Sequence, residues 1–213
     1  MSERRIAGRV VHRGGGLAGT QVLAADEAAG AVLADTESGP DGSWELAVPD
    51  DRALLAVARC RGPALGLAAA PVGAGPVELD LGTTHDVTLR LEGDELPGWA
   101  RPAVQLMPLH LAEVEERLLR WITAPVREVS GGPLGRITTE ARELALAAQP
   151  GTWWVTARLE VVPDARTPDM PADLHLQTVR ASVGGRDLPV AREGYTFELD
   201  GPLEVVLTLA SAR

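Results

Sequence analysis

Alternating apolar and polar residues predict short β-strands along the first 91 residues. In the clearest stretch, apolar Trp44, Leu46 and Val48 occupy every second position. A period of two puts one side of a strand on a core and the other toward solvent. Asp41-Gly42 precedes this stretch and favours a tight turn, because glycine adopts left-handed backbone freely. A β-hairpin therefore organises the first half of the chain.

The same reasoning predicts six more strands in this half, at residues 6–12, 20–25, 31–36, 53–60, 77–81 and 87–91. The high content of Ala, Gly and Pro predicts a loop at residues 62–75. About seven short strands with turns between them are typical of an antiparallel β-sandwich, and strand 87–91 would close it.

The second half combines strands with one predicted helix. Acidic residues, Gly and Pro mark residues 93–102 as a linker. An α-helix is expected near 109–123, because apolar residues recur there every three or four positions; they are Leu111, Val114, Leu118, Trp121 and Ile122. Further strands are expected at 143–146, 152–162, 174–183, 187–192, 195–199 and 203–210.

These patterns predict an all-β protein of two tandem antiparallel β-sandwich domains, of Greek-key, immunoglobulin- or prealbumin-like type. The first domain covers residues 1–92. The second covers residues 103–213 and carries the inserted helix.

Composition narrows the function classes. The chain has no Lys and no Asn, and Arg supplies all 20 basic residues, which indicates a high-GC bacterial genome. Chemistry that depends on a lysine Schiff base or a P-loop lysine is excluded. A net charge of −10 argues against nucleic-acid binding. With a single cysteine, no signal-peptide pattern and no long apolar run, we expect a cytoplasmic protein with no membrane contact.

The order of motifs in residues 6–91 resembles the carboxypeptidase regulatory-like (transthyretin- or prealbumin-like) β-sandwich family. The motifs are I-A-G-R-V-V, G-L-A-G-T-Q-V, T-E-S-G-P-D-G-S-W-E-L-A-V-P and H-D-V-T-L-R-L. Trp44 stands where the family usually has Phe or Tyr, and the proline before Leu17 is missing. The resemblance implies a seven-stranded sandwich with an accessory or binding role and transfers no catalytic residue. The second half resembles no family.

Side chains with reactive or metal-binding chemistry are scattered. The four histidines are far apart in sequence, so no metal site is predicted. Asp35, Glu37 and Asp41 could gather calcium, but the EF-hand order is absent and a solvated turn is favoured. Cys60 lies between two arginines, yet strand neighbours point to opposite faces, so a small buried residue is favoured. We predict no catalytic residue and no cofactor.

Four residues are candidate contacts for a partner or ligand. Trp154 shares its strand face with polar neighbours such as Arg158, so something must cover its indole or bind it. Burial under a helix or loop of the same domain competes with this interpretation. Trp99 in the linker can pack between the two domains. Leu118 lies on the apolar stripe of the predicted helix, which could dock on a partner.

The sequence therefore favours a non-enzymatic binding or adaptor protein that engages an unidentified protein partner through sheet edges, loops or the helix. A small-ligand or carbohydrate-binding module that uses Trp154 and the loop at 163–171 is the alternative. An enzyme with Asp, Glu and His at the domain interface ranks third. The oligomeric state does not follow from the sequence.

Overall fold

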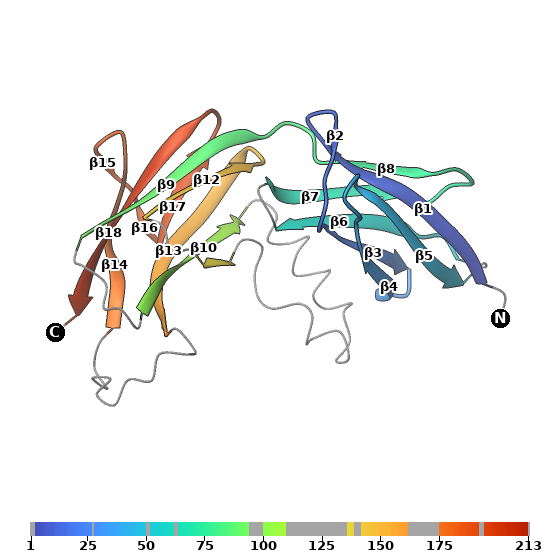
Figure 1. Ribbon diagram of the computed structural model, residues 1–213, viewed down its shortest axis with the longest axis horizontal. Helices are drawn as coiled ribbons and strands as arrows, with labels where there is room; N and C mark the ends of the chain where they lie inside the picture. Colours follow the sequence, from blue (N-terminus) through green and yellow to red (C-terminus); the bar gives the residue numbers. More distant parts are fainter. Residues whose placement is uncertain are drawn as a thin grey trace. The chain divides into compact units, whose positions relative to one another are not determined.

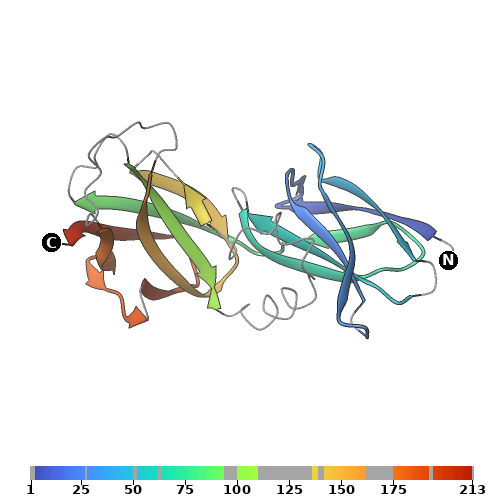
Figure 2. The same cartoon turned by 90° about the horizontal axis from the view of Figure 1, so that it is seen from below.

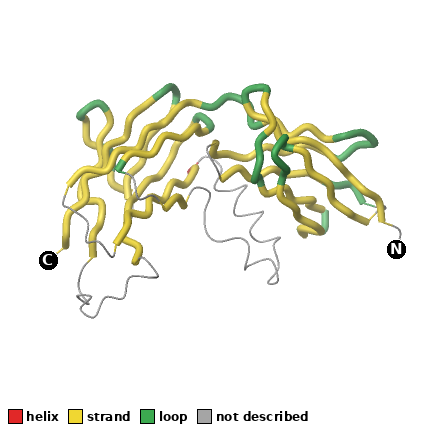
Figure 3. Tube along the Cα trace, viewed as in Figure 1, coloured by secondary structure: helices red, strands yellow, loops and turns green. Residues whose placement is uncertain are grey.

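In the computed structural model the described part of the chain consists of strands joined by turns and loops (Figure 3). The structure describes residues 3–26, 28–49, 52–61, 64–93, 100–109, 136–138, 142–161, 175–191 and 194–212. The predicted all-β class is confirmed for these residues. Residues 110–123 of the predicted helix and 94–99 of the predicted linker lie outside them. In the described ranges, no helix has the length and apolarity to cross a membrane.

Contacts within the chain divide it into two compact units. Unit 1 comprises Met1–Thr84 and Leu111–Leu134, and unit 2 comprises His85–His110 and Gly135–Arg213. Each unit is described by itself below.

Unit 1 is a sandwich of two sheets (Figures 1 and 2). In one sheet β1 is flanked by β5 and β8 and also pairs with the short β2. The other sheet has the order β7–β6–β3–β4. The strands are β1 (Glu3–His12), β2 (Gly15–Gly16), β3 (Gln21–Asp26), β4 (Ala31–Glu37), β5 (Ser43–Pro49), β6 (Leu55–Arg61), β7 (Ala64–Pro71) and β8 (Val77–Asp80).

The predicted hairpin strand forms as β5. Trp44, Leu46 and Val48 are 5%, 5% and 1% exposed, while the residues between them are exposed. The indole of Trp44 lies against Gly8 of β1, where a Cβ atom would come within 2.6 Å of the ring. Gly42 takes the left-handed conformation expected of the turn, with φ of 82°.

Two expectations for unit 1 were wrong. Residues 64–71, expected to lie in a loop, form β7, which pairs with β6 from Leu65 to Pro71. Ala64 and Leu65 are almost fully buried, so the small residues that resemble a loop in sequence are instead packed against other strands. The strand expected to close the first sandwich is β9 (His85–Gly93), which pairs with β12 and β18 of unit 2.

Unit 2 contains two groups of paired strands, which are joined where Arg158 of β13 pairs with Gln177 of β14. One has the order β12–β9–β18–β14, with β15 paired to β14. In the other, β13 lies between β10 and β17, with β11 outside β10 and β16 outside β17. The strands are β10 (Ala100–Pro108), β11 (Arg136–Thr138), β12 (Glu143–Ala148), β13 (Gly151–Val161), β14 (His175–Val183), β15 (Arg186–Asp187), β16 (Val190–Ala191), β17 (Gly194–Leu199) and β18 (Leu203–Ala212).

The core of unit 2 follows the period of two on β13. Trp153, Val155 and Ala157 are fully buried, and Trp153 donates its indole N–H to the carbonyl of Gln149 at 2.9 Å. Phe197 and Leu199 of β17 are buried as well. The predicted strand 187–192 is interrupted and forms the short strands β15 and β16.

Both units pair their first described strand with their last in parallel. In unit 1, Gly8–Val11 of β1 pairs with Val77–Asp80 of β8. In unit 2, Val87–Gly93 of β9 pairs with Leu203–Leu209 of β18. The other strand pairs that join elements within a unit are antiparallel where the register is described.

Candidate functional site

Trp154 is covered by the chain's own hairpin of β16 and β17. In the register of β13 it lies between Met107 of β10 and Thr196 of β17. Its indole N–H donates to the carbonyl of Ala191 at 3.0 Å. The ring also lies over Gly194, where a Cβ atom would be 2.5 Å from it. The half-buried indole is therefore held in one place by β16 and β17.

The hairpin that covers Trp154 presents an exposed valine. Val190 of β16 is 74% exposed, the only large apolar side chain so exposed among the residues that the structure describes. Isolated exposed apolar residues are common on proteins, so exposure alone does not make a site. Val190 differs from such residues because its strand is held by β17 on one side and by the Trp154 indole on the other.

The anchoring contacts come from β17 and from Trp154. Val190 pairs with Tyr195 and Ala191 with Gly194. The N–H of Thr196 donates to the carbonyl of Pro189 at 3.0 Å. We call residues 189–191 the β16 edge, because within the described part of the chain β16 pairs with β17 alone.

Trp154 and Val190 lie on opposite faces of this edge. Val190 shares its face with Tyr195, its partner in the register, whereas the indole of Trp154 reaches Ala191 from the other face. The structure thus gives Trp154 a supporting role behind the β16 edge. The sequence pattern drew attention to Trp154 but not to Val190, because exposure of a single valine beside Pro189 leaves no periodic signal.

Of the other predicted contact residues, Arg158 alone has a described backbone, and it does not pair with the β16 edge. Arg158 lies in β13 opposite Ala103 and Gln177, and nothing further is described of its side chain. Trp99 and Leu118 lie outside the described residues. The loop at 163–171, invoked for a carbohydrate site, lies outside them as well. These roles stay predictions.

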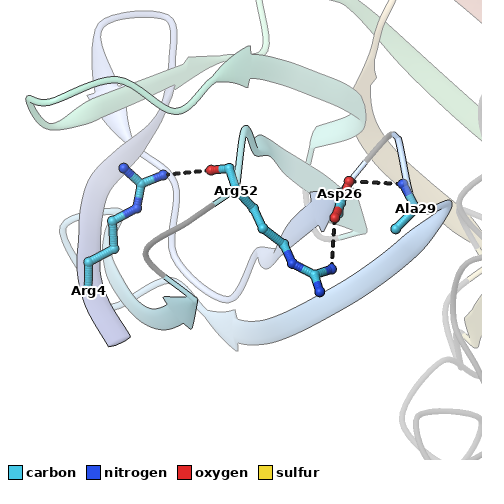
Figure 4. Close-up of polar contacts among 4 residues, drawn as sticks. All are labelled: Arg4, Asp26, Ala29 and Arg52. Carbon is cyan, nitrogen blue, oxygen red and sulfur yellow. Dashed lines mark hydrogen bonds and ion pairs between the residues drawn. The ribbon is translucent and has the colours of Figure 1, made fainter. Parts of the chain in front are cut away.

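A buried carboxylate in unit 1 forms a second polar cluster (Figure 4). Asp26 is 6% exposed, accepts a hydrogen bond from the N–H of Ala29 at 2.9 Å and pairs with Arg52 at 2.8 Å. The guanidinium of Arg4 donates to the carbonyl of Arg52 at 3.1 Å. The hydrogen bond from Ala29, helped by Arg52, holds the pKa of Asp26 below its usual value.

This cluster ties four parts of the fold together. Asp26 ends β3, Ala29 lies in the turn before β4, Arg52 follows β5 and Arg4 belongs to β1. The carboxylate is fully engaged by Ala29 and Arg52, so its geometry suits a structural clamp rather than an acid or base that exchanges protons with a substrate.

Cys60 is a small buried residue, as predicted. Its side chain is fully buried, and the hydroxyl of Thr20 lies 3.9 Å from its sulfur. Burial raises the pKa of the thiol to about 11, although the contact with Thr20 acts in the opposite direction. A thiol in this state has little nucleophilic thiolate at neutral pH.

The acidic residues near the first hairpin do not converge. Both the N–H and the hydroxyl of Ser43 donate to the carboxylate of Asp41, at 3.0 and 2.6 Å. These hydrogen bonds lower the pKa of Asp41 and fix the turn. Asp35 and Glu37 are exposed on β4. Across the described ranges, no group of three or more His, Cys, Asp or Glu side chains is placed to hold a metal ion.

Comparison with known proteins does not assign a family. No protein-family model matches the chain, and no curated protein matches it. The resemblance to carboxypeptidase regulatory-like domains is therefore supported only at the level of a β-sandwich.

Similar solved structures include the TIE protein of Bacillus anthracis, with 10% identity and a TM-score of 0.29 over 99% of this chain. This chain spans 34% of that protein. The shaft pilin SpaA from Lactobacillus rhamnosus GG shows 11% identity and a TM-score of 0.31, over 100% of this chain and 99% of the pilin. The minor pilin GBS52 of Streptococcus agalactiae shows 7% identity and a TM-score of 0.34, over 99% and 97%.

The predicted cytoplasmic location is contradicted by the presence of pilins among these similar structures, and we withdraw it. With identities of 11% or less and TM-scores below 0.5, the same structures carry no argument for another location or for a function of this chain.

Proposed function

We propose that this chain is a non-enzymatic binding or adaptor protein that engages a protein partner at the β16 edge of unit 2. The observation that carries the proposal is the 74% exposed side chain of Val190 on an anchored two-residue strand. A rigid apolar side chain loses little conformational entropy on binding, so most of the free energy gained when a partner buries it contributes to affinity.

The surroundings of Val190 fit contact with a protein. Pro189 beside it is also exposed. Because β16 has only two residues, it leaves few unpaired backbone groups at the sheet edge. Burying one valine contributes about 1.5–3 kcal/mol if the partner supplies an apolar pocket. Trp154 supports the edge from behind through its bond to Ala191.

A carbohydrate site on Trp154 has less support. Sugars stack on an open aromatic face, whereas one face of this indole is against Gly194 and its N–H is used by Ala191. We therefore treat Trp154 as part of the frame of the proposed site.

The test is partner capture from lysate of the native host, with wild-type protein and Val190→Asp in parallel. Because the side chain of Val190 is exposed, the fold should tolerate aspartate there, and the new charge should affect only the binding of a partner. Ala145→Asp places the same charge at an exposed position of β12 and serves as the matched control. A protein retained by wild type and Ala145→Asp but lost with Val190→Asp supports the proposal.

Two results contradict this proposal. If well-folded wild type enriches no protein, the adaptor role is rejected. If a captured protein binds Val190→Asp as strongly as wild type, the β16 edge is not the site.

We further propose that the chain comprises two tandem β-sandwich domains, the first of carboxypeptidase regulatory-like type. Its support is that the glycines of the resemblance occupy positions requiring glycine: Gly8 lies beneath Trp44, and Gly19 and Gly42 have φ of 66° and 82°. The pairing of β9 with β18 favours residues 81–84 as the junction instead of 93–102. Limited proteolysis should cut near this junction, where Gly82 and Thr83 are exposed, before it cuts within either unit if the proposal is correct.

A further inference from the structure

β4 is the last strand of its sheet in unit 1 (Figure 1). Among the residues that the structure describes, it pairs with β3 alone. The pairing is regular from Glu37, opposite Gln21, to Ala34, opposite Ala24, and the register then shifts at Leu33. The open side of β4 therefore offers a short regular stretch, residues 34–37, that a further strand can join.

A hydrogen bond at the end of this stretch shows which backbone groups point outward. The N–H of Ser38 donates to the carbonyl of Thr20 at 2.9 Å, so the backbone groups of Ser38 face β3. Successive residues of a strand turn these groups to opposite sides, so Asp35 and Glu37 turn theirs away from β3. In the described ranges, no hydrogen bond engages the outward N–H and C=O groups of these two residues.

The side chains of the same two residues are exposed and unpaired. Asp35 and Glu37 lie two positions apart and therefore on one face of β4. Neither carboxylate has an ion pair or hydrogen bond with any residue that the structure describes. The exposed Glu45 of β5 differs, because Arg5 holds it at 2.8 Å. β4 thus presents two free negative charges along an open backbone edge.

We propose that an extended segment of a partner protein, with arginine or lysine at every second position, adds to β4 as a further strand. Its backbone groups pair with the outward N–H and C=O groups of Asp35 and Glu37. Two of its basic side chains lie beside the two carboxylates, because residues opposite one another in a sheet share a face. The residue between them lies on the face of the half-buried Thr36, where a β-branched side chain fits.

Charge favours a basic segment over a second copy of this chain. Two β4 strands joined edge to edge would set the carboxylates of one copy against those of the other, and like charges directly opposite destabilise a sheet. Charged side chains on edge strands prevent such self-association. They attract a segment of the opposite charge, and the net charge of −10 strengthens this attraction at long range.

This surface is separate from the β16 edge, because β4 belongs to unit 1 and β16 to unit 2. Binding at one does not depend on binding at the other. A chain with a binding edge in each unit can hold two proteins together, which is the role of an adaptor.

Residue-resolved hydrogen exchange by NMR tests the strand addition in the full-length protein. The probe is a blocked peptide, T-R-V-R-T, at about 10 mM, which nearly saturates a site with a Kd of about 1 mM. We expect the amides of Asp35 and Glu37 to exchange about tenfold more slowly with the peptide. The amides of Ala34 and Thr36 face β3 and should not change.

Two control peptides separate backbone pairing from charge. N-methylation of both arginines keeps the charge but removes the N–H groups that pair with β4. The peptide T-E-V-E-T keeps the N–H groups but reverses the charge. Neither control should slow exchange at Asp35 and Glu37.

A pair of double variants tests the carboxylates. Asp35→Asn with Glu37→Gln should weaken binding of T-R-V-R-T by about 2- to 30-fold, because two exposed ion pairs are lost. Glu78→Gln with Glu92→Gln removes the same charge from exposed positions of β8 and β9 and should bind as wild type does.

Four results would overturn the proposal. They are unchanged exchange at Asp35 and Glu37 with saturating peptide, equal protection by the N-methylated peptide, and equal affinity of the two double variants. The fourth is slower exchange at these amides as protein concentration rises without peptide, which would mean that a second copy occupies the edge.

Discussion

Replacing Gly194 by alanine is the sharpest test of how the Trp154 indole is held. No left-handed φ is recorded for Gly194, so the backbone accepts alanine, but the added Cβ would come within 2.5–2.6 Å of three indole atoms. Forcing such an overlap costs about 1–3 kcal/mol. Losing the bond from the indole to Ala191 adds about 0.5–1.5 kcal/mol. Alanine also lowers the conformational entropy of the unfolded chain relative to glycine, which stabilises the folded state by about 0.4–1 kcal/mol and offsets part of this cost.

We therefore expect Gly194→Ala to lower the free energy of unfolding of unit 2 by about 0.5–4 kcal/mol. Urea-induced unfolding followed by circular dichroism measures it. Gly201→Ala is the matched control, because nothing lies within 4 Å of its Cβ position and no left-handed φ is recorded there. The control should be neutral or stabilising by up to about 1 kcal/mol.

A double-mutant cycle isolates the contact. In the background of Trp154→Ala the ring is gone, so Gly194→Ala should no longer cost stability. If the two substitutions instead add within about 0.3–0.5 kcal/mol, the indole does not rest on Gly194 and the supporting role of Trp154 is refuted.

Four further predictions concern unit 1. Gly8→Ala should destabilise it by about 2 kcal/mol or more, because the methyl group overlaps the β8 backbone and the Trp44 ring, whereas Gly73→Ala, with open space around it, should not; thermal unfolding compares them. Trp44→Phe should lose packing but no hydrogen bond, because the indole N–H is buried without a partner, so its cost in urea unfolding should stay below about 2 kcal/mol. The pKa of Asp26 is lower in the folded state than its ordinary value of 3.8, so its contribution is fully present above pH 3.8 and is lost as pH falls through the folded pKa; Asp26→Asn should make stability less acid-sensitive below pH 3.8 in a pH series of unfolding curves. Cys60, with its pKa raised to about 11, should resist thiol reagents at pH 8 until the protein is unfolded, as thiol titration with and without urea will show.

The sequence predicts most strands correctly where side-chain alternation is strong. Trp44, Leu46 and Val48 identify β5 because one face of it is buried and the other exposed. β7 is not predicted because its alanines and its single glycine show no alternation, and its strand form comes from pairing with β6. The assignment of β9 fails for a different reason: its alternation is correct, but the partner of a strand depends on contacts far along the chain, here with β18.

The candidate site could be predicted only in part. The sequence indicates that something must cover Trp154, and the structure identifies the cover as Ala191 and Gly194. No pattern in the sequence distinguishes Val190 from the many buried valines, because its exposure results from the interruption of one strand into β15 and β16.

The parallel pairing of β1 with β8 has a mechanical consequence. Tension applied at the two ends of this strand pair pulls β1 and β8 in opposite directions along a shared axis. The ladder between Gly8–Val11 and Val77–Asp80 is then loaded in shear, so its hydrogen bonds resist together instead of opening one by one. The hydrogen bond from Leu81 to the carbonyl of Val11 and the contact between His12 and Thr84 extend this region to Thr84, where the first segment of unit 1 ends. Pulling along the strands should therefore separate β1 from β8 less readily than peeling them apart from one end.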